Sequence, residues 1–559
     1  MNDLSDGVYS ENMKEENSDI IDITGRWGKW QAIILLCLAY LSIPAAWYNL
    51  NMAFLAPNIN YWCKKPSEYE NLTMEEWKNY SIPLVMEDEV RIYSKCEMYD
   101  SLIRSSNKTL ISCTSWDYDH SFYKSTIVEE WDLVCDRAWL ASFAQSLYYL
   151  GFLLTAFIGG QLSDKFGRKR TFYICVVWTF IFGMISTFSQ NFWMFAICRF
   201  FLALGRASSF LIIYVLSTEV VGKEYRLLVG LFGTAGWALG QMILPGLVWL
   251  FRDWFHIELI SALSFIIFFP LWRIIPESPR WLLSQGRVIE AEEILRYAAK
   301  LNKRNVVNLN EKLQSISEKI MIESEGKDNK RITFLDIMKC PNLRRLSLIL
   351  YTVWIANVLS YYGLSFSADD IGVDSLLFFF LAALVEIPAC VLYFCFQHHI
   401  GRKLMLIIPM VITGLICLIA ISVPKDFSII LIVLSVISKF SMSISLITIY
   451  LLPAEIYPTV VRNVGLGSCS MMGRLGAIAA PFMKEAAIHV HRVFPLALFG
   501  IISIFGALLV LLLPETKDLK LSDTLAQGEH IGRCTTYVLV KKSENEEAVE
   551  DNSTENKLI

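Results

Sequence analysis

The amino-acid sequence predicts an all-α membrane protein with twelve transmembrane helices in two similar six-helix halves. Three observations lead to this prediction. The 559-residue chain is 54% hydrophobic and only 19% charged, whereas an ordinary soluble domain has about 25% charged residues. Apolar runs of about 20 residues, the length that crosses a bilayer as a helix, recur along almost the whole chain. Three short motifs also occur twice, at nearly the same separation.

Counting the apolar runs in order gives the twelve predicted spans. Among the clearest are residues 32–54, 172–188 and 404–423. The spans are predicted to begin near Trp30, Ala138, Phe172, Phe192, Leu227, Ile257, Leu346, Asp374, Leu404, Phe427, Val464 and Val493. The first residues are acidic and lack the basic stretch and apolar core of a cleaved signal peptide. We therefore expect no span to be removed.

The short loops predict how the chain is oriented, because Lys and Arg accumulate on the cytoplasmic side of a membrane protein. Basic segments such as "DKFGRKR" and "GKEYR" follow the second and fourth spans, and "GRK" and "PTVVRN" follow the eighth and tenth. All four lie on one side of the membrane. Both termini are therefore predicted to be cytoplasmic.

A long polar segment between the first two spans, residues 58–137, is predicted to be extracellular. It carries an even number of cysteines, which suits an oxidising compartment and allows three possible pairings; they are Cys63, Cys96, Cys113 and Cys135. It also carries three N-glycosylation sequons, at Asn71, Asn79 and Asn107. Both features agree with the predicted orientation.

An internal repeat divides the chain. Gly-Arg-Lys recurs 234 residues apart, a Glu seven residues before an Arg recurs 236 apart, and Pro-Glu recurs 238 apart. Matched pairs at nearly one spacing indicate two parallel halves. The predicted parts are a cytoplasmic N-terminal segment, a first bundle, a linker with short helices, a second bundle and a cytoplasmic tail, at residues 1–29, 30–275, 276–343, 344–513 and 514–559.

Charged residues at the cytoplasmic ends of the repeated spans are predicted to gate the protein. Acidic and basic side chains there can pair within one half or across the two, and a rocking motion can make or break such pairs. The alternative, that the basic residues only set topology, leaves the repeated Glu unexplained. The candidates are Asp164, Arg168, Glu219, Arg226, Glu455 and Arg462.

These motifs resemble a known family. "GQLSDKFGRKR", "PESPRWLL", "AEIYPTVVRNVGLG" and "LPETKD", together with the cysteine-bearing outer loop, are similar to the organic cation, organic anion and carnitine transporters of the major facilitator superfamily. The resemblance implies two six-helix bundles around a central cavity that work by alternating access in the plasma membrane. One departure is "HHIGRK", which has His398 and His399 where an acidic and a basic residue are usual.

Three ionisable residues lie deep within predicted spans: Arg474, Lys439 and Glu386. A charge at such depth is costly and usually faces the bundle interior, a partner or water. The resemblance implies that Arg474 and Lys439 bind a substrate carboxylate and that Glu386 meets an ammonium group. A structural ion pair of Glu386 with one of the two cations remains the alternative, although one cation would then stay unbalanced.

Aromatic and amide side chains complete the predicted site, since aromatic faces attract protonated or quaternary amines. Under the family arrangement these residues face the cavity; they are Tyr361, Trp354, Gln241, Tyr362 and Trp237.

The leading functional prediction is a polyspecific carrier of small organic ions, most of all zwitterions or amine conjugates resembling carnitine. Organic anion or organic cation transport within the same family, and a non-transporting receptor or sensor with this fold, remain alternatives. No metal-ligand spacing, Walker loop or nucleophile constellation indicates an enzyme, and we expect no cofactor or metal. No basic patch indicates nucleic-acid binding. The expected partners are the substrate and the lipid bilayer, around a monomer, with an oligomer through the outer loop left open.

Overall fold

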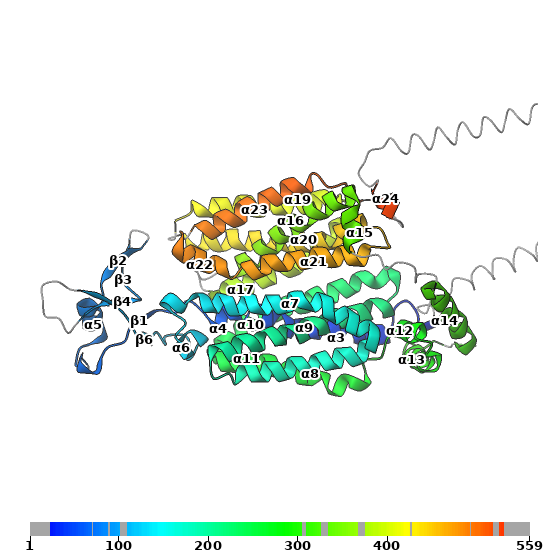
Figure 1. Cartoon of the computed structure of the whole chain (residues 1–559), viewed down its shortest axis with the longest axis horizontal. Coiled ribbons are helices and arrows are strands. Elements are labelled where there is room, and N and C mark those ends of the chain that lie inside the picture. Colours follow the sequence, from blue (N-terminus) through cyan, green and yellow to red (C-terminus); the bar gives the residue numbers. More distant parts are fainter. Residues whose placement is uncertain are drawn as a thin grey trace, which may run out of the picture.

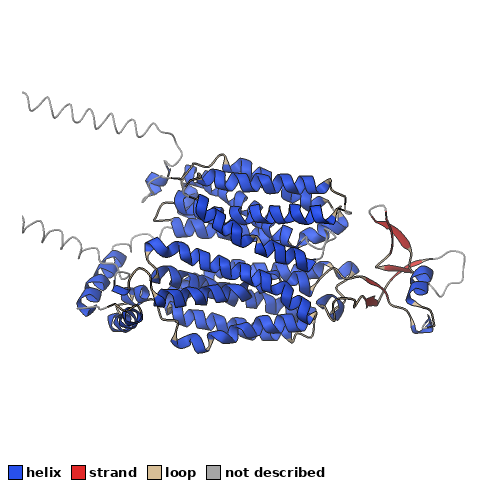
Figure 2. Cartoon of the chain, turned by 180° about the vertical axis from the view of Figure 1, so that it is seen from behind, coloured by secondary structure: helices blue, strands red, loops and turns tan. Residues whose placement is uncertain are grey.

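The computed structural model describes residues 23–529, except 70, 88–89, 101–108, 305–308, 326–333, 367–374, 398, 425–426, 492 and 518–524. Two helical bundles lie side by side, with a small strand-containing domain at one end and a group of short helices at the other (Figure 1). We call these ends the loop end and the linker end. Figure 2 shows from behind that strands occur only at the loop end of the described chain.

The N-terminal bundle consists of long helices that match the first six predicted spans. They are α3 (Lys29–Leu50), α7 (Trp139–Phe166), α8 (Arg168–Thr187), α9 (Phe192–Val220), α10 (Arg226–Phe251) and α11 (Trp254–Leu263), the last extended by 3₁₀ turns to Arg273. Close packing of α10 on α3 depends on glycine, since a Cβ at Gly236 would lie 2.0 Å from the carbonyl oxygen of Ala39. Small residues allow such close approach of helices in a membrane.

The C-terminal bundle repeats this pattern, with its eighth span broken at Val385. Its helices are α16 (Pro341–Phe366), α17 (Ser375–Leu384), α18 (Glu386–Phe396), α19 (Arg402–Ile421), α20 (Ser428–Ile456), α21 (Arg462–Ala479) and α23 (Phe494–Val510). The bundles meet where α7 packs on α21 and where α10 packs on α17. A helix thus begins within five residues of every predicted start.

Most of these helices are long and apolar enough to cross a membrane. Nine described helices qualify, and a tenth is the pair Cys135–Thr155 and Ile158–Phe166, whose directions differ by 42°. The other two predicted spans are α21, which has 18 residues and carries Arg474, and α23, an apolar helix of 17 residues.

The segment between the first two long helices folds into a small domain. Short antiparallel pairs join β1 (Tyr61–Cys63) to β6 (Trp116–Tyr118), β2 (Leu84–Glu87) to β3 (Val90–Tyr93) and β4 (Glu97–Tyr99) to β5 (Leu110–Ser112). Four short helices lie in or beside this region and at the loop end: α4 (Met52–Leu55), α5 (Met74–Ser81), α6 (Ile127–Glu130) and α22 (Phe482–His489).

Short helices also gather at the linker end, as the sequence predicts for residues 276–343. They are α12 (Pro279–Ser284), α13 (Val288–Leu301), α14 (Leu309–Glu325), α15 (Phe334–Lys339) and, after the second bundle, α24 (Leu525–Glu529). The first three share an apolar core that includes Leu283, Leu295 and Leu313. This core places the start of the linker against the N-terminal bundle (Figure 1).

Candidate functional site

Glu386 lies at the interface of the two bundles. It is the first residue of α18, at the break in the eighth span, and only 4% of it is exposed. Its carboxylate accepts hydrogen bonds from Gln241 Nε2 at 2.7 Å and from the Tyr361 hydroxyl at 2.5 Å. Because Gln241 belongs to the N-terminal bundle, this carboxylate joins the two halves.

Lys439 of α20 provides the counter-charge. Its Nζ lies 3.7 Å from Glu386 Oε1, donates to the hydroxyl of Ser365 at 2.7 Å and stands 3.3 Å from the centre of the Tyr361 ring. Trp237 Nε1 donates to the same Tyr361 hydroxyl at 3.2 Å. The structure therefore contains an ion pair between Lys439 and Glu386, which the sequence indicated as an alternative to substrate binding. The two charges balance each other within the protein.

Arg474 lies apart from that pair, on the face of α21 toward the N-terminal bundle. Its guanidinium carbon is 3.8 Å from the centre of the Phe152 ring, and that of Arg206 is 4.8 Å from the same centre. Arg474 is partly exposed, whereas Arg206 is only 3% exposed. Within the described chain, neither guanidinium has a carboxylate within ion-pair distance.

The Phe152 ring does not compensate these two charges. A cation–π contact contributes about 0.5–2 kcal/mol, whereas the effective cost of burying an ion is several kcal/mol. Arg206 has one hydrogen bond, from Nη1 to the carbonyl oxygen of Ala45 at 3.3 Å, and its Nε has no partner among the described residues. The described chain thus retains two guanidiniums without a carboxylate partner, the buried one of Arg206 and the partly exposed one of Arg474.

Aromatic side chains connect the two charged groups. The Tyr362 ring lies 5.2 Å from that of Tyr361 and 5.1 Å from that of Tyr149. Because Tyr149 belongs to the N-terminal bundle, its contact with Tyr362 joins the two bundles. Trp354 instead packs inside the C-terminal bundle, 4.6 Å from Tyr450 and directly against Gly473. Of the predicted aromatic residues, Tyr361 contacts Glu386 directly and Trp237 contacts it through the Tyr361 hydroxyl, Tyr362 packs between Tyr361 and Tyr149, and Trp354 packs inside the C-terminal bundle.

The hydrogen bonds that join the bundles in the described residues lie at mid-depth and at the loop end. At mid-depth they are those of Gln241 and Trp237 described above. At the loop end, Ser142 donates to the carbonyl oxygen of Pro481 at 3.1 Å and Ser146 donates to that of Ile478 at 2.6 Å. The halves are thus held together on the loop side of the central site.

Comparisons with known proteins show the family and the fold. The family described as "Sugar (and other) transporter" matches residues 95–525. The chain is 35% identical to the organic cation transporter protein of Drosophila melanogaster, over 92% of this chain and 95% of that protein. It is 32% identical to the human organic cation/carnitine transporter 2, over 91% and 93%. It is 31% identical to the carcinine transporter of Drosophila melanogaster, over 92% and 79%.

The chain belongs to the organic cation and carnitine transporter family. It is a transporter of organic ions and not an enzyme. Solved structures of the xylose transporter XylE from E. coli share the major facilitator fold. An inward-open form in a partially occluded state has a TM-score of 0.58 at 17% identity, covering 88% of this chain and 99% of that one. The fold and family predicted from the sequence are confirmed.

The transporter carries a charged cluster at the linker end of its N-terminal bundle. Arg168 lies 2.7 Å from Asp164 and 3.1 Å from Glu219. Glu277 accepts hydrogen bonds from the backbone N–H groups of Arg168 and Lys169, at 2.7 and 3.0 Å. The cluster ties four segments of one half together.

The C-terminal bundle repeats this cluster with one acid fewer. Arg402 Nε lies 3.3 Å from Glu455, and Glu515 accepts from the backbone N–H groups of Arg402 and Lys403. The position that corresponds to Asp164 is occupied by His398, which lies outside the described residues. Described ion pairs at this end therefore form within each half.

The other two predicted gating residues have different neighbours. Arg226 begins α10, is exposed, and has no ion partner in the described chain. Arg462 begins α21 and donates through Nε to the carbonyl oxygen of Tyr457 at 3.4 Å. Glu219 and Glu455 pair with Arg168 and Arg402 instead of with the arginines seven residues further on.

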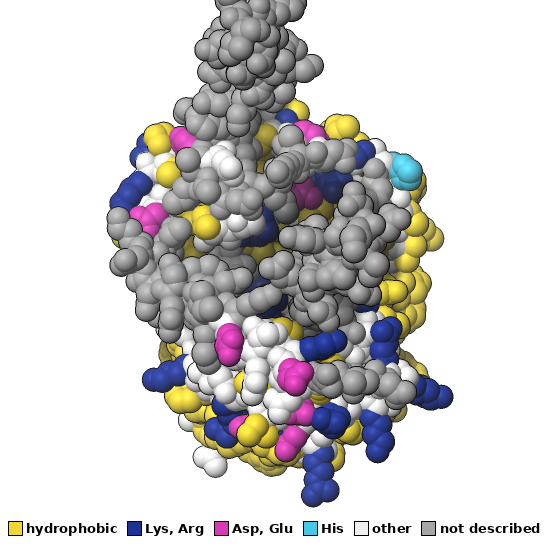
Figure 3. Space-filling model, turned by 90° about the vertical axis from the view of Figure 1, so that its right-hand side faces the viewer, with side chains coloured by type: hydrophobic (Ala, Val, Ile, Leu, Met, Phe, Trp, Pro, Cys, Tyr) yellow, Lys and Arg dark blue, Asp and Glu magenta, His cyan; other side chains and the backbone are white. Residues whose placement is uncertain are grey.

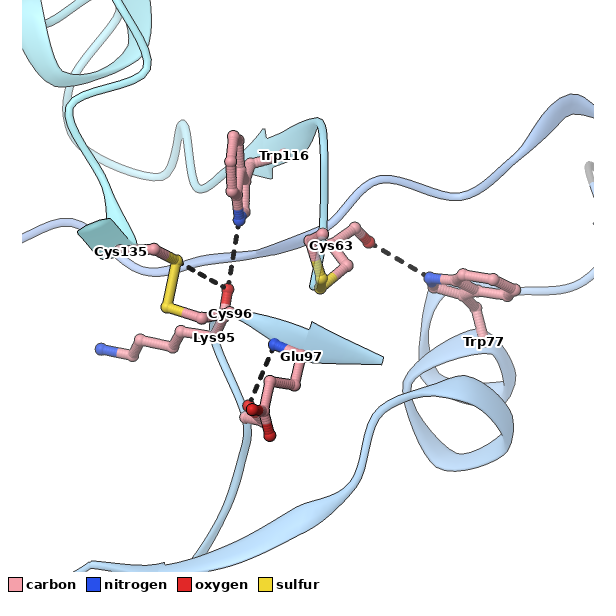
Figure 4. The surroundings of a disulfide bond; sticks show 9 residues. Cys63, Trp77, Lys95, Cys96, Glu97, Trp116 and Cys135 are labelled. Atoms are coloured by element: carbon pink, nitrogen blue, oxygen red, sulfur yellow. Dashed lines mark hydrogen bonds between the residues drawn. A yellow bond between two sulfur atoms is a disulfide. The ribbon is translucent and has the colours of Figure 1, made fainter. Parts of the chain in front are cut away.

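The outer domain contains both disulfides, Cys63–Cys113 and Cys96–Cys135. Figure 4 shows two tryptophans beside them: Trp77 Nε1 donates to the carbonyl oxygen of Cys63, and Trp116 Nε1 donates to that of Lys95, each at 3.2 Å. The structure thus selects one of the three pairings that the sequence allows.

Two of the three predicted glycosylation residues, Asn71 and Asn79, are exposed in this domain. The side-chain oxygen of Asn79 accepts a hydrogen bond from the Tyr93 hydroxyl. Asn107 lies outside the described residues.

Sequence reasoning missed several residues of the site. Phe152, Tyr149 and Ser365 lie in spans where apolar and small polar residues are common, so no sequence signal distinguishes them. Glu277 and Glu515 had a signal, because each belongs to the repeated Pro-Glu motif. Arg206 had one too, as a cation in the middle of a predicted span.

Proposed function

We propose that this transporter moves small organic ions bearing a carboxylate, chiefly zwitterions or amine conjugates resembling carnitine, across the plasma membrane. The observation that carries the proposal is Arg474, a partly exposed guanidinium at the bundle interface with no carboxylate partner in the described chain. Arg can hold a substrate carboxylate through two parallel N–H bonds. The neighbouring rings of Tyr362 and Tyr149 offer faces to an ammonium group.

The names of the relatives support this choice. The human protein is an organic cation/carnitine transporter and one Drosophila melanogaster protein is a carcinine transporter. Lys439 already neutralises Glu386 in this conformation, so a substrate cation has to rely on the aromatic faces or displace Lys439. This arrangement disfavours a simple organic cation.

The mechanism that fits the geometry is alternating access. Interbundle hydrogen bonds among the described residues lie at mid-depth and on the loop side of the site, as for Ser142 and Ser146, which fits a site that opens toward the linker end. Rocking of the bundles about the central contacts opens the loop end when those hydrogen bonds break. Described linker-end clusters centred on Arg168 and Arg402 lie within single halves, so each bundle can move as a unit.

The proposed orientation places the linker end in the cytoplasm. Lys and Arg side chains, with Asp and Glu among them, lie on the part of this face where the short linker helices stand in front of the N-terminal bundle (Figure 3). The basic segment of residues 164–170 joins α7 to α8 at the same end, as the positive-inside rule predicts. The disulfide-bonded domain with Asn71 and Asn79 then faces the oxidising exterior. Both termini would be cytoplasmic.

Uptake measurements test the proposal. Labelled carnitine, an organic cation such as tetraethylammonium and a monocarboxylate such as hexanoate are supplied to cells expressing wild type, Arg474→Ala or the control Arg226→Ala at matched surface levels. We expect carnitine uptake by wild type and the control and its loss in Arg474→Ala. Uptake of the cation alone, unchanged by Arg474→Ala, would refute the carboxylate assignment.

Organic anion transport is the second candidate. It is favoured by the charge balance of the described interior, which retains the positive charges of Arg206 and Arg474 after the other buried ions are paired. In the same assay this function predicts that hexanoate enters faster than carnitine.

A further inference from the structure

Arg206 stands out among the buried ions because nothing in the proposed mechanism uses it. It lies at the middle of α9 and is 3% exposed. Its Nε has no hydrogen-bond partner in the described chain, and its ring contact with Phe152 is shared with Arg474. A buried cation without a carboxylate is destabilising unless another anion approaches it.

A second buried donor lies in the same place. Tyr148 precedes Phe152 by four residues on α7, so the two side chains lie on one face of that helix. Tyr148 is fully buried and its hydroxyl has no described partner, while its ring lies 5.2 Å from the guanidinium carbon of Arg199. Because the guanidiniums of Arg206 and Arg474 both lie within 5 Å of the centre of the Phe152 ring, their like charges repel each other. Two cations without a described carboxylate and a neutral hydroxyl without a described partner therefore create a site for a negatively charged acceptor.

We propose that Arg206 is a second anion-binding residue of the central site, and that together with Arg474 it selects substrates carrying two negative charges, of which a dicarboxylate is the simplest. This inference rests on the proposed role of Arg474 in carboxylate binding. Arg474, the more accessible cation, takes one acidic group, and Arg206 with the Tyr148 hydroxyl takes the other. The shared ring of Phe152 moves aside when the second group enters.

The charge balance explains why two acidic groups are preferred. Arg199 is paired with Glu258, and Lys439 is paired with Glu386. A substrate with one carboxylate leaves one described buried cation uncompensated, whereas a dianion compensates both. A zwitterion such as carnitine gives its single carboxylate to Arg474 and, like a monocarboxylate, leaves Arg206 uncompensated.

The test compares three probes that differ in charge: adipate with two carboxylates, hexanoate with one on a chain of equal length, and carnitine. KM is measured for each in cells expressing wild type, Arg206→Met or Arg206→Lys at matched surface levels. For Arg206→Met we expect the KM for adipate to rise about tenfold or more relative to the KM for hexanoate, the size of a lost charge-assisted hydrogen bond. Arg206→Lys, which keeps the charge, should recover part of the affinity for adipate.

Several outcomes would overturn the inference. If wild type takes up carnitine but neither transports adipate nor is inhibited by it, Arg206 does not select dianions, and the proposed function stands. If Arg206→Met raises the KM of all three probes by the same factor, Arg206 acts on the structure of the site as a whole. If none of the probes enters wild-type cells, the proposed function itself fails.

Thermal unfolding of purified protein in detergent gives an independent measurement. Because Arg206→Met removes an uncompensated buried charge, its Tm without substrate should equal or exceed that of wild type. Adipate should raise the Tm of wild type and leave that of Arg206→Met unchanged. A lower Tm for the substrate-free variant, or an equal adipate shift in both proteins, contradicts the inference.

Discussion

Arg199 and Arg206 lie seven residues apart on α9, two turns along one helix face. Both are buried. The Arg199 guanidinium lies 3.7 Å from Glu258 and donates to Gln145 at 3.0 Å and to Asn51 at 3.2 Å. Arg206 reaches one carbonyl oxygen and shares an aromatic ring with Arg474.

The difference separates two uses of a buried charge. A cation that has a carboxylate and several neutral partners inside the protein contributes to the packing of the bundle. Its charge and its hydrogen-bond donors are already satisfied, so it does not attract a ligand. A cation without a carboxylate keeps its electrostatic cost until a ligand supplies the charge. Residue type and burial are nearly the same for both arginines, so their neighbours distinguish a structural role from a functional one.

The largest expected effect concerns the compensated arginine. Arg199→Met leaves the Glu258 carboxylate, whose side chain is 0% exposed, without its cation, and breaking such a buried pair costs about 3–5 kcal/mol of folding free energy. The Tm of the purified variant, measured by fluorescence-detected gel filtration after heating, should fall well below that of wild type. Arg206→Met is the matched control on the same helix. Equal losses of Tm in the two variants would contradict the distinction between a structural Arg199 and an uncompensated Arg206.

A smaller effect is expected at the Lys439–Glu386 pair. Lys439→Met should cost about 2–3 kcal/mol, less than Arg199→Met, because besides its ion pair Lys439 donates one described side-chain hydrogen bond, to Ser365, whereas Arg199 donates to several acceptors. Adding Glu386→Gln should restore most of the lost Tm, since no charge is then left unpaired. Unfolding curves of both single variants and the double variant give the coupling between the two residues. Additive losses of Tm would show that the pair is not coupled.

The linker-end clusters extend the comparison to partly exposed charges. Arg168 has two carboxylates within 3.1 Å, whereas Arg402 has Glu455 at 3.3 Å. We expect Arg168→Ala to cost about 1–2 kcal/mol and Arg402→Ala to cost less, because fewer charged partners are lost. Tm and the initial rate of carnitine uptake measure the two variants side by side. A larger loss for Arg402→Ala would contradict this ranking.

The smallest effect is expected at Arg226, which is exposed and has no ion partner in the described chain. Arg226→Ala should change stability by no more than about 0.5 kcal/mol, as is usual for a surface substitution. Its Tm and uptake rate should match those of wild type. A marked loss of uptake would contradict this expectation and would support the gating role that the sequence predicts for Arg226.

Much of the fold was predictable because the signals are local. A run of about 20 apolar residues forms a helix in a bilayer whatever its neighbours are, since each backbone group has to be satisfied within the segment. Every predicted span accordingly has a helix near its predicted start. The strand pairs of the outer domain were not predicted, because strands of three or four residues give little periodicity to detect.

The charged clusters were predictable only in part. The repeat identified Arg168, Glu219 and Glu455 as residues at the ends of spans. The sequence left open whether these charges pair within one half or across the two halves, and in the structure Glu219 of α9 pairs with Arg168 of α8. Pairing between helices depends on how the helices cross, which a one-dimensional spacing does not record.

The sequence by itself determined the membrane location of the long helices, the twofold repeat, the transporter family and the presence of deep charges at Glu386, Lys439 and Arg474. Only the tertiary structure decided which of those charges are compensated: it paired Lys439 with Glu386, paired Arg199 with Glu258, and left Arg206 beside Arg474. The reason is physical. Hydrophobicity is summed along the chain, whereas Coulomb energy depends on distances of a few ångströms between residues that lie far apart in sequence.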